Sequence, residues 1–87
     1  MTFDEIKQTL AGENPNALFA DGLEAACIGI GRRCGQPALA VYDYDKAVQL
    51  FVDDGMSHED AVEWMEFNVV GAWMGENTPI WFYCPTE

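Results

Sequence analysis

Basic side chains are scarce in this sequence of 87 residues: four lysines and arginines stand against fifteen aspartates and glutamates, which gives a net charge of −11 at pH 7. Such an excess of negative charge repels the phosphates of nucleic acids and of anionic membranes, so it disfavours direct binding to either. The same charge attracts a basic protein surface and speeds association with it. Solubility alone is the alternative explanation of so many acidic residues.

Histidine and cysteine are also scarce. His58 is the only histidine, and Cys27, Cys34 and Cys84 form no Cys-x-x-Cys pair. This set builds neither a disulfide framework nor a structural zinc site, and it indicates free thiols in a reducing compartment. His58 has no neighbouring nucleophile, and Cys34 has no neighbouring base. We therefore predict no catalytic residue, no cofactor and no enzymatic activity.

Two further patterns resemble ligand sites but are weak. Asp43 and Asp45 are spaced to chelate a divalent ion, but no EF-hand pattern surrounds them and helix capping accounts for one of the pair. The segment Gly29-Ile-Gly31-Arg-Arg-Cys-Gly35 lacks the lysine-serine ending of a P-loop and the spacing of a dinucleotide fingerprint. We predict neither a metal site nor a nucleotide motif.

Long apolar runs are absent as well. No stretch approaches the roughly 20 residues of a membrane span, and the acidic N-terminus lacks the basic and apolar regions of a signal peptide. An apolar fraction of 49% still suffices for one core. Residues 1–87 are therefore expected to form a single domain that is soluble and cytoplasmic.

Local patterns predict helices with polar caps. Thr2 and Glu5 form a capping box for the first helix, Asp43 or Asp45 caps the second, and Ser57 caps the third. Alternating apolar residues bounded by glycine and proline predict the strands. The expected elements are a helix ending at Gly12, strands over residues 25–33 and 37–43, helices ending near Asp54 and Trp73, and a strand over residues 80–84.

The order of these elements is α-ββ-αα-β. It predicts an α+β fold in which a small three-stranded antiparallel or mixed sheet packs against two to three helices. The sequence leaves open whether the last strand pairs with the first strand or with the second.

The helix expected from Ser57 to Trp73 has two contrasting sides. At 100° per residue, Asn68 falls near the centre of its apolar side. A buried amide needs hydrogen-bond partners, so we predict that Asn68 is structural and bonds either the turn 77–79 or the strand end at Asp43. A ligand-binding role is the alternative. Gly71 is expected to let a neighbouring backbone approach closely. The apolar side comprises Ala61, Trp64, Met65, Asn68 and Ala72.

Acidic residues on and before this helix form the predicted partner-binding surface. The helix carries no lysine or arginine to offset the mutual repulsion of its glutamates. Two aspartates lie in the last turn of the preceding helix, where the macrodipole disfavours anions. This uncompensated charge indicates a basic partner, and a merely solvated face is the alternative. The residues are Asp53, Asp54, Glu59, Glu63 and Glu66.

The last strand is apolar on both faces, because Trp81 and Tyr83 alternate with Ile80 and Phe82. One face is expected to pack on the helices, and the other on the first helix, on a second copy or on a partner. Tryptophan and tyrosine are enriched at interface hot spots, so we add Trp81 and Tyr83 to the predicted partner-binding residues.

Several segments together resemble a family of small, mostly uncharacterised accessory proteins encoded by bacteriophages. The resemblance covers about residues 20–82. It implies a non-structural role in the cytoplasm of an infected bacterium, and small acidic phage proteins of this kind resemble inhibitors of host defence such as anti-CRISPR proteins. The segments are Ala20-Asp-Gly-Leu23, Val41-Tyr-Asp43, Lys46, Gly55-Met56, Glu59-Asp-Ala61, Glu66-Phe-Asn-Val-Val-Gly-Ala72, Gly75-Glu76 and Thr78-Pro79.

Two hypotheses of function follow. The first is a non-enzymatic inhibitor whose acidic surface binds a basic host protein that handles nucleic acid or defends the cell. The second is a binder or sponge of a small nucleotide signal, with Arg32, Arg33, the glycines of the first strand and Asn68 forming a pocket across a homodimer.

Overall fold

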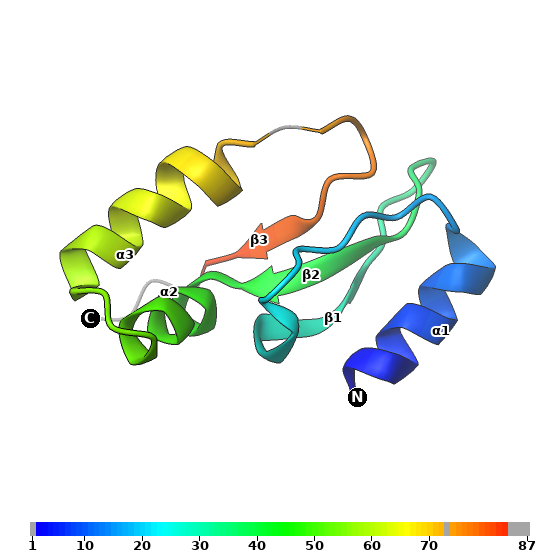
Figure 1. The fold of residues 1–87 in the computed structure, drawn as a ribbon. Coiled ribbons are helices and arrows are strands. Elements are labelled where there is room, and N and C mark those ends of the chain that lie inside the picture. Colours follow the sequence, from blue (N-terminus) through cyan, green and yellow to red (C-terminus); the bar gives the residue numbers. More distant parts are fainter. Residues whose placement is uncertain (1, 73, 84–87) are drawn as a thin grey trace.

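The computed structural model describes residues 2–72 and 74–83 of the chain. It confirms an α+β fold with a mixed three-stranded sheet and the order α-ββ-αα-β. None of the described helices is long and apolar enough to cross a membrane. The elements (Figure 1) are α1 (Phe3–Glu13), a 3₁₀ turn η1 (Glu24–Ala26), β1 (Cys27–Gly31), β2 (Leu39–Asp43), α2 (Tyr44–Asp53), α3 (His58–Trp64), a π-helical turn η2 (Met65–Val70) and β3 (Ile80–Phe82).

Polar caps begin the three α-helices where the sequence predicts them. The Thr2 hydroxyl accepts from the Glu5 N–H at 3.2 Å, and the Glu5 carboxylate accepts from the Thr2 N–H at 2.8 Å. The Ser57 hydroxyl accepts from the Asp60 N–H at 3.1 Å. For α2 the cap is Asp43, which accepts from the Lys46 N–H at 3.2 Å, so this carboxylate satisfies a free helical donor.

The sheet places β2 between the two other strands. β1 and β2 pair antiparallel, and β2 and β3 pair parallel, so the last strand joins the second one. Parallel pairing requires a crossover, which α2 and α3 provide. Both hairpin strands are shorter than predicted, and β3 ends at Phe82; Cys84 lies outside the described residues.

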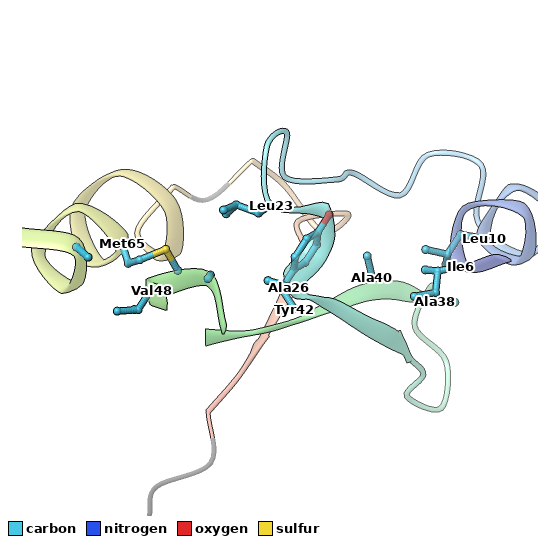
Figure 2. Close-up of a cluster of buried hydrophobic side chains, with 11 residues drawn as sticks. Ile6, Leu10, Leu23, Ala26, Ala38, Ala40, Tyr42, Val48 and Met65 are labelled. Carbon is cyan, nitrogen blue, oxygen red and sulfur yellow. The ribbon is translucent and has the colours of Figure 1, made fainter. Parts of the chain in front are cut away.

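The core occupies one side of this sheet (Figure 2), where α1, α2 and α3 all contribute side chains. Tyr42 lies fully buried, and its ring stacks on Trp81 of the next strand with centroids 5.2 Å apart. Its hydroxyl accepts from the Ala20 N–H at 2.9 Å. The opposite face of the sheet carries Ile80 and Phe82, which are exposed. The first helix therefore packs on the core side and leaves this outer face uncovered.

A buried amide fastens the loops together, but it belongs to Asn14 rather than to Asn68. Asn14 is 8% exposed; its Nδ2 donates to the Ala38 carbonyl at 2.8 Å and to Asn77 Oδ1 at 3.0 Å. Its own Oδ1 accepts from the Asn16 N–H at 3.3 Å. Three segments distant in sequence thus meet at one side chain.

The prediction of a buried Asn68 is wrong, because the helix changes its hydrogen-bond period. Asn68 is exposed and lies in the π-helical turn that follows Met65. A π-type bond spans one residue more than an α-helical bond, so the phase assumed at 100° per residue is lost there. The turn ends where the Gly71 N–H donates to the Glu66 carbonyl at 3.1 Å. Trp73, the predicted end of the helix, lies outside the described residues.

Gly71 has a structural role, and the backbone that approaches it is that of its own helix. A Cβ atom at this position would lie 2.7 Å from the Glu66 carbonyl oxygen, closer than side chains tolerate. The prediction that a neighbouring backbone approaches Gly71 is therefore wrong, because the close contact comes from the preceding turn of the same helix.

Candidate functional site

The five acidic residues predicted to bind a partner are all exposed and lie on one end of the molecule. Asp53 ends α2, Asp54 caps its carboxyl end, and the three glutamates follow on α3 and η2. Asp53 accepts a hydrogen bond from Gln49 at 2.8 Å. We call this set the acidic surface: Asp53, Asp54, Glu59, Glu63 and Glu66.

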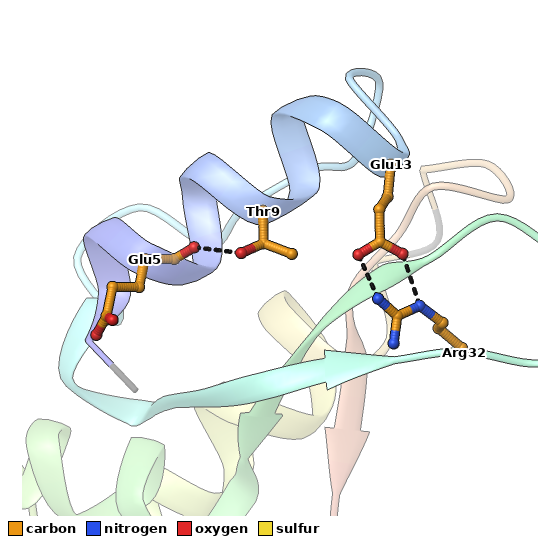
Figure 3. Close-up of polar contacts among 4 residues, drawn as sticks. All are labelled: Glu5, Thr9, Glu13 and Arg32. Carbon is orange, nitrogen blue, oxygen red and sulfur yellow. Dashed lines mark hydrogen bonds and ion pairs between the residues drawn. The ribbon is translucent and has the colours of Figure 1, made fainter.

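Within residues 2–72 and 74–83, no ion pair joins the acidic surface to a basic side chain. Residues 47–83 contain seven aspartates and glutamates but no lysine or arginine. Among the described residues, the ion pair that forms is the one between Arg32 and Glu13, at the end of the molecule that carries α1 (Figures 1 and 3). Arg32 Nε lies 2.6 Å from Glu13 Oε1, and this hydrogen bond holds the pKa of Glu13 below its usual value. The negative charge is therefore concentrated around α3.

Two aromatic side chains accompany the acids on α3 and η2. Phe67 is 76% exposed and Trp64 is 45% exposed. Together with Asp60 and Glu63 they border a shallow hollow of about 480 Å³. Trp64 was predicted to face inward, and its exposure contradicts that prediction; it lies in α3 before the π-helical turn, so the change of helical period does not account for it. Phe67 was not among the predicted residues. Ala61 and Met65 do lie in the core as predicted.

Trp81 and Tyr83 differ from each other in environment. Trp81 lies half-buried on the core side of the sheet against Tyr42, so its ring is in part a structural element. Tyr83 is 62% exposed and meets the ring of Tyr44 edge to face, with centroids 5.6 Å apart. The exposed side of β3 is the one that carries Ile80 and Phe82, so Tyr83 is the more exposed of the two predicted partner-binding aromatics.

A cavity of about 470 Å³ brings three of the predicted residues together, and we call it the aromatic pocket. Tyr44, Trp81 and Tyr83 contribute rings to it, and Glu66 contributes a carboxylate. The Tyr44 hydroxyl donates to Glu66 Oε2 at 2.7 Å. Burial and this contact with a carboxylate raise the pKa of Tyr44 to about 12, so the phenol stays a donor at neutral pH. Asp45, Val48, His58, Val62 and Val70 complete the lining.

The residues of the small-molecule hypothesis are not gathered in one place. Arg32 and Arg33 line a separate cavity of about 370 Å³, whereas Asn68 lines the hollows beside Trp64. Gly31, one of the first-strand glycines of that hypothesis, is already covered, because a Cβ there would lie 2.8 Å from Ile80 Cδ1. Arg32 is engaged by Glu13.

Metal-ligating side chains do not cluster in the described part of the chain: no three of its histidine, cysteine, aspartate and glutamate residues are placed to hold one ion. Comparison with known proteins adds no further constraint, because no protein-family model, curated protein or solved structure matches the chain.

Proposed function

We propose that this protein is a non-enzymatic bacteriophage accessory protein that acts in the host bacterial cytoplasm. It binds a basic surface of a host protein that handles nucleic acid or defends the cell, and it inhibits that protein by occupying the surface. The observation that carries the proposal is the acidic surface, which has exposed aromatic side chains beside it and forms no ion pair with a base in the described part of the chain. The phage context rests on the sequence resemblance.

Electrostatics supports a basic partner. Exposed carboxylates without counterions repel one another on α3, and a cationic partner relieves this repulsion when it binds. Opposite charge mainly speeds the encounter of the two proteins and fixes their relative orientation. This attraction weakens steeply as ionic strength rises. The inhibitor should therefore associate fast and lose affinity in high salt.

Apolar burial supports a protein rather than a small counterion as the partner. Phe67 and Trp64 expose large apolar side chains next to Glu63. Interfaces depend on a few such aromatic anchors, whereas the charged rim contributes mainly to specificity. A partner that covers the two aromatic side chains and the acidic surface gains binding energy from Trp64 and Phe67 and selectivity from the carboxylates.

The test is affinity capture from bacterial lysate at low and high salt, with a charge-reversed variant. Glu59→Lys, Glu63→Lys and Glu66→Lys together should abolish capture of a basic protein that the wild-type chain retains at low salt. The matched control is Asp4→Lys, Asp21→Lys and Glu76→Lys, which changes the net charge equally at exposed positions elsewhere. Circular dichroism checks that both variants fold.

Two results contradict the proposal: loss of capture in both variants, or capture that survives reversal of the acidic surface. The small-molecule hypothesis, with its homodimer, stays a sequence-based prediction, because no contact in the structure favours it over the acidic surface.

A further inference from the structure

The aromatic pocket combines apolar walls with carboxylates at one place. Its rings come from the start of α2, from β3 and from the residue that follows β3, and its valines come from α2 and from the helical turns after Ser57. The carboxylates of Glu66 and Asp45 border the same cavity of about 470 Å³. A ligand that fits must therefore offer both an apolar body and a positive charge.

The carboxylate of Glu66 is positioned before any ligand arrives. Its Oε2 accepts from the Tyr44 hydroxyl at 2.7 Å, and Tyr44 is in turn held by the edge-to-face contact with Tyr83. An ionised carboxylate has about four acceptor sites, so most of its capacity remains free. No base pairs with Glu66 or Asp45 among residues 2–72 and 74–83. The free acceptor sites of Glu66 are held beside three aromatic rings.

The chemistry of these walls selects a guanidinium group. Aromatic faces attract cations, and Arg is preferred over Lys at such sites because its planar group stacks on a ring while its N–H donors reach a carboxylate. The methylene stem of an arginine also packs on apolar side chains such as Val48 and Val62. An anion is repelled here, and a neutral apolar group leaves the carboxylates without partners.

We propose that the aromatic pocket is a recognition site for an arginine side chain on the basic surface of the partner, with Glu66 and Asp45 as the carboxylates and Tyr44, Trp81 and Tyr83 as the stacking walls. This inference rests on the proposed function and gives it a point of specificity. Glu66 belongs both to the acidic surface and to the pocket. The acidic surface attracts the partner at long range, and the arginine in the pocket then fixes the orientation of the bound partner.

The test titrates the ¹⁵N-labelled protein with a capped Gly-Arg-Gly tripeptide and with the same peptide in which citrulline replaces arginine. Citrulline keeps the shape of arginine and removes its charge. The arginine peptide should give saturable shifts at the amides of Tyr44, Val62 and Glu66, with affinity at least roughly tenfold higher than that of the citrulline peptide. Glu66→Gln should weaken the arginine peptide several-fold.

Glu63→Gln is the matched control, because Glu63 lies on the same helix outside the pocket. Three results overturn the pocket assignment. The two peptides bind equally well, the two variants lose equal affinity for the arginine peptide, or no shift saturates up to about 20 mM peptide. These outcomes are separate from lysate capture. If capture depends on the acidic surface but the peptides fail, the pocket is wrong and the proposed function stands. If the arginine peptide saturates the pocket but no partner is captured from lysate, the pocket assignment stands and the proposed function is wrong.

Discussion

The side-chain amide of Asn14 donates a hydrogen bond to Asn77 Oδ1 at 3.0 Å, across 63 positions of the sequence. The same amide donates to the Ala38 carbonyl, so one nitrogen joins the end of α1, the approach to β2 and the turn before β3. Because Asn14 and Ala38 are buried, the amide and the Ala38 carbonyl have lost water as an alternative partner. This amide has the clamping role that the sequence suggested for Asn68.

Replacing Asn14 tests that role directly. Asn14→Ala leaves the Ala38 carbonyl and the Asn77 side chain without their donor, and we expect a loss of about 2–3 kcal/mol in the free energy of unfolding. Asn68→Ala is the matched control, because Asn68 is exposed, and it should change stability by less than about 0.5 kcal/mol. Urea denaturation of the two variants measures both values. An equal effect of the two substitutions would disprove the assignment of the clamp.

Substitution of Gly71 tests the end of the π-helical turn. In Gly71→Ala the new methyl group meets the Glu66 carbonyl oxygen at 2.7 Å, and we expect a loss of about 1–3 kcal/mol as the turn opens. Gly12→Ala adds the same methyl group in α1, where nothing lies within 4 Å, so it should leave stability unchanged or raise it by up to about 1 kcal/mol. Thermal unfolding compares the pair, and a neutral Gly71→Ala would contradict the tight contact.

Local chemistry explains which parts of the fold are readable from the sequence. Helix starts depend on side chains within three positions, so the caps at Thr2 and Ser57 were predictable from neighbouring residues alone. The pairing of β3 with β2 depends on contacts between residues about 40 positions apart, such as Val41 and Ile80, and a three-residue strand carries no signal for its partner. The π-helical turn was unpredictable by periodicity, because periodicity assumes α-helical bonds throughout.

The candidate site divides in the same way. The acidic surface follows from composition and helical spacing, so its residues could be named in advance. The aromatic pocket depends on Tyr44, Glu66 and Tyr83 meeting across three elements, which no local pattern encodes.

Alkaline pH should destabilise the protein through Tyr42 and Tyr44. Burial raises the pKa of Tyr42 and of Tyr44 from 10 to about 12. Between these values the unfolded chain has released phenolic protons that the folded chain still binds, so the free energy of unfolding falls as pH rises from about 10 to 12. Burial also raises the pKa of the Cys27 thiol, which acts in the same direction from a lower pH.

Urea denaturation at pH 9 and at higher pH measures this loss, and absorbance at alkaline pH follows tyrosine ionisation. Tyr42→Phe and Tyr44→Phe should each make the decline shallower, because each removes one group whose pKa differs between the two states. A decline of unchanged slope in both variants would assign the alkaline loss to other groups.

The negative charge on α3 should itself reduce stability. Glu63 lies four positions after Glu59 within α3, so these two like charges face one another on the helix. In Glu63→Lys the repulsion from Glu59 becomes an attraction, and we expect a gain of about 0.5–1 kcal/mol in the free energy of unfolding at low salt, which disappears near 1 M salt. Asp4→Lys makes the same change of net charge in the first turn of α1, where a cation opposes the helix dipole, and it should lower stability by about 0.3–1 kcal/mol. A gain in the free energy of unfolding in both variants would show that the lower total negative charge stabilises the protein, and not the local change beside Glu59. Opposite signs, measured by urea denaturation, would show that these glutamates oppose folding locally, as expected of residues whose favourable contacts form only when a basic partner binds.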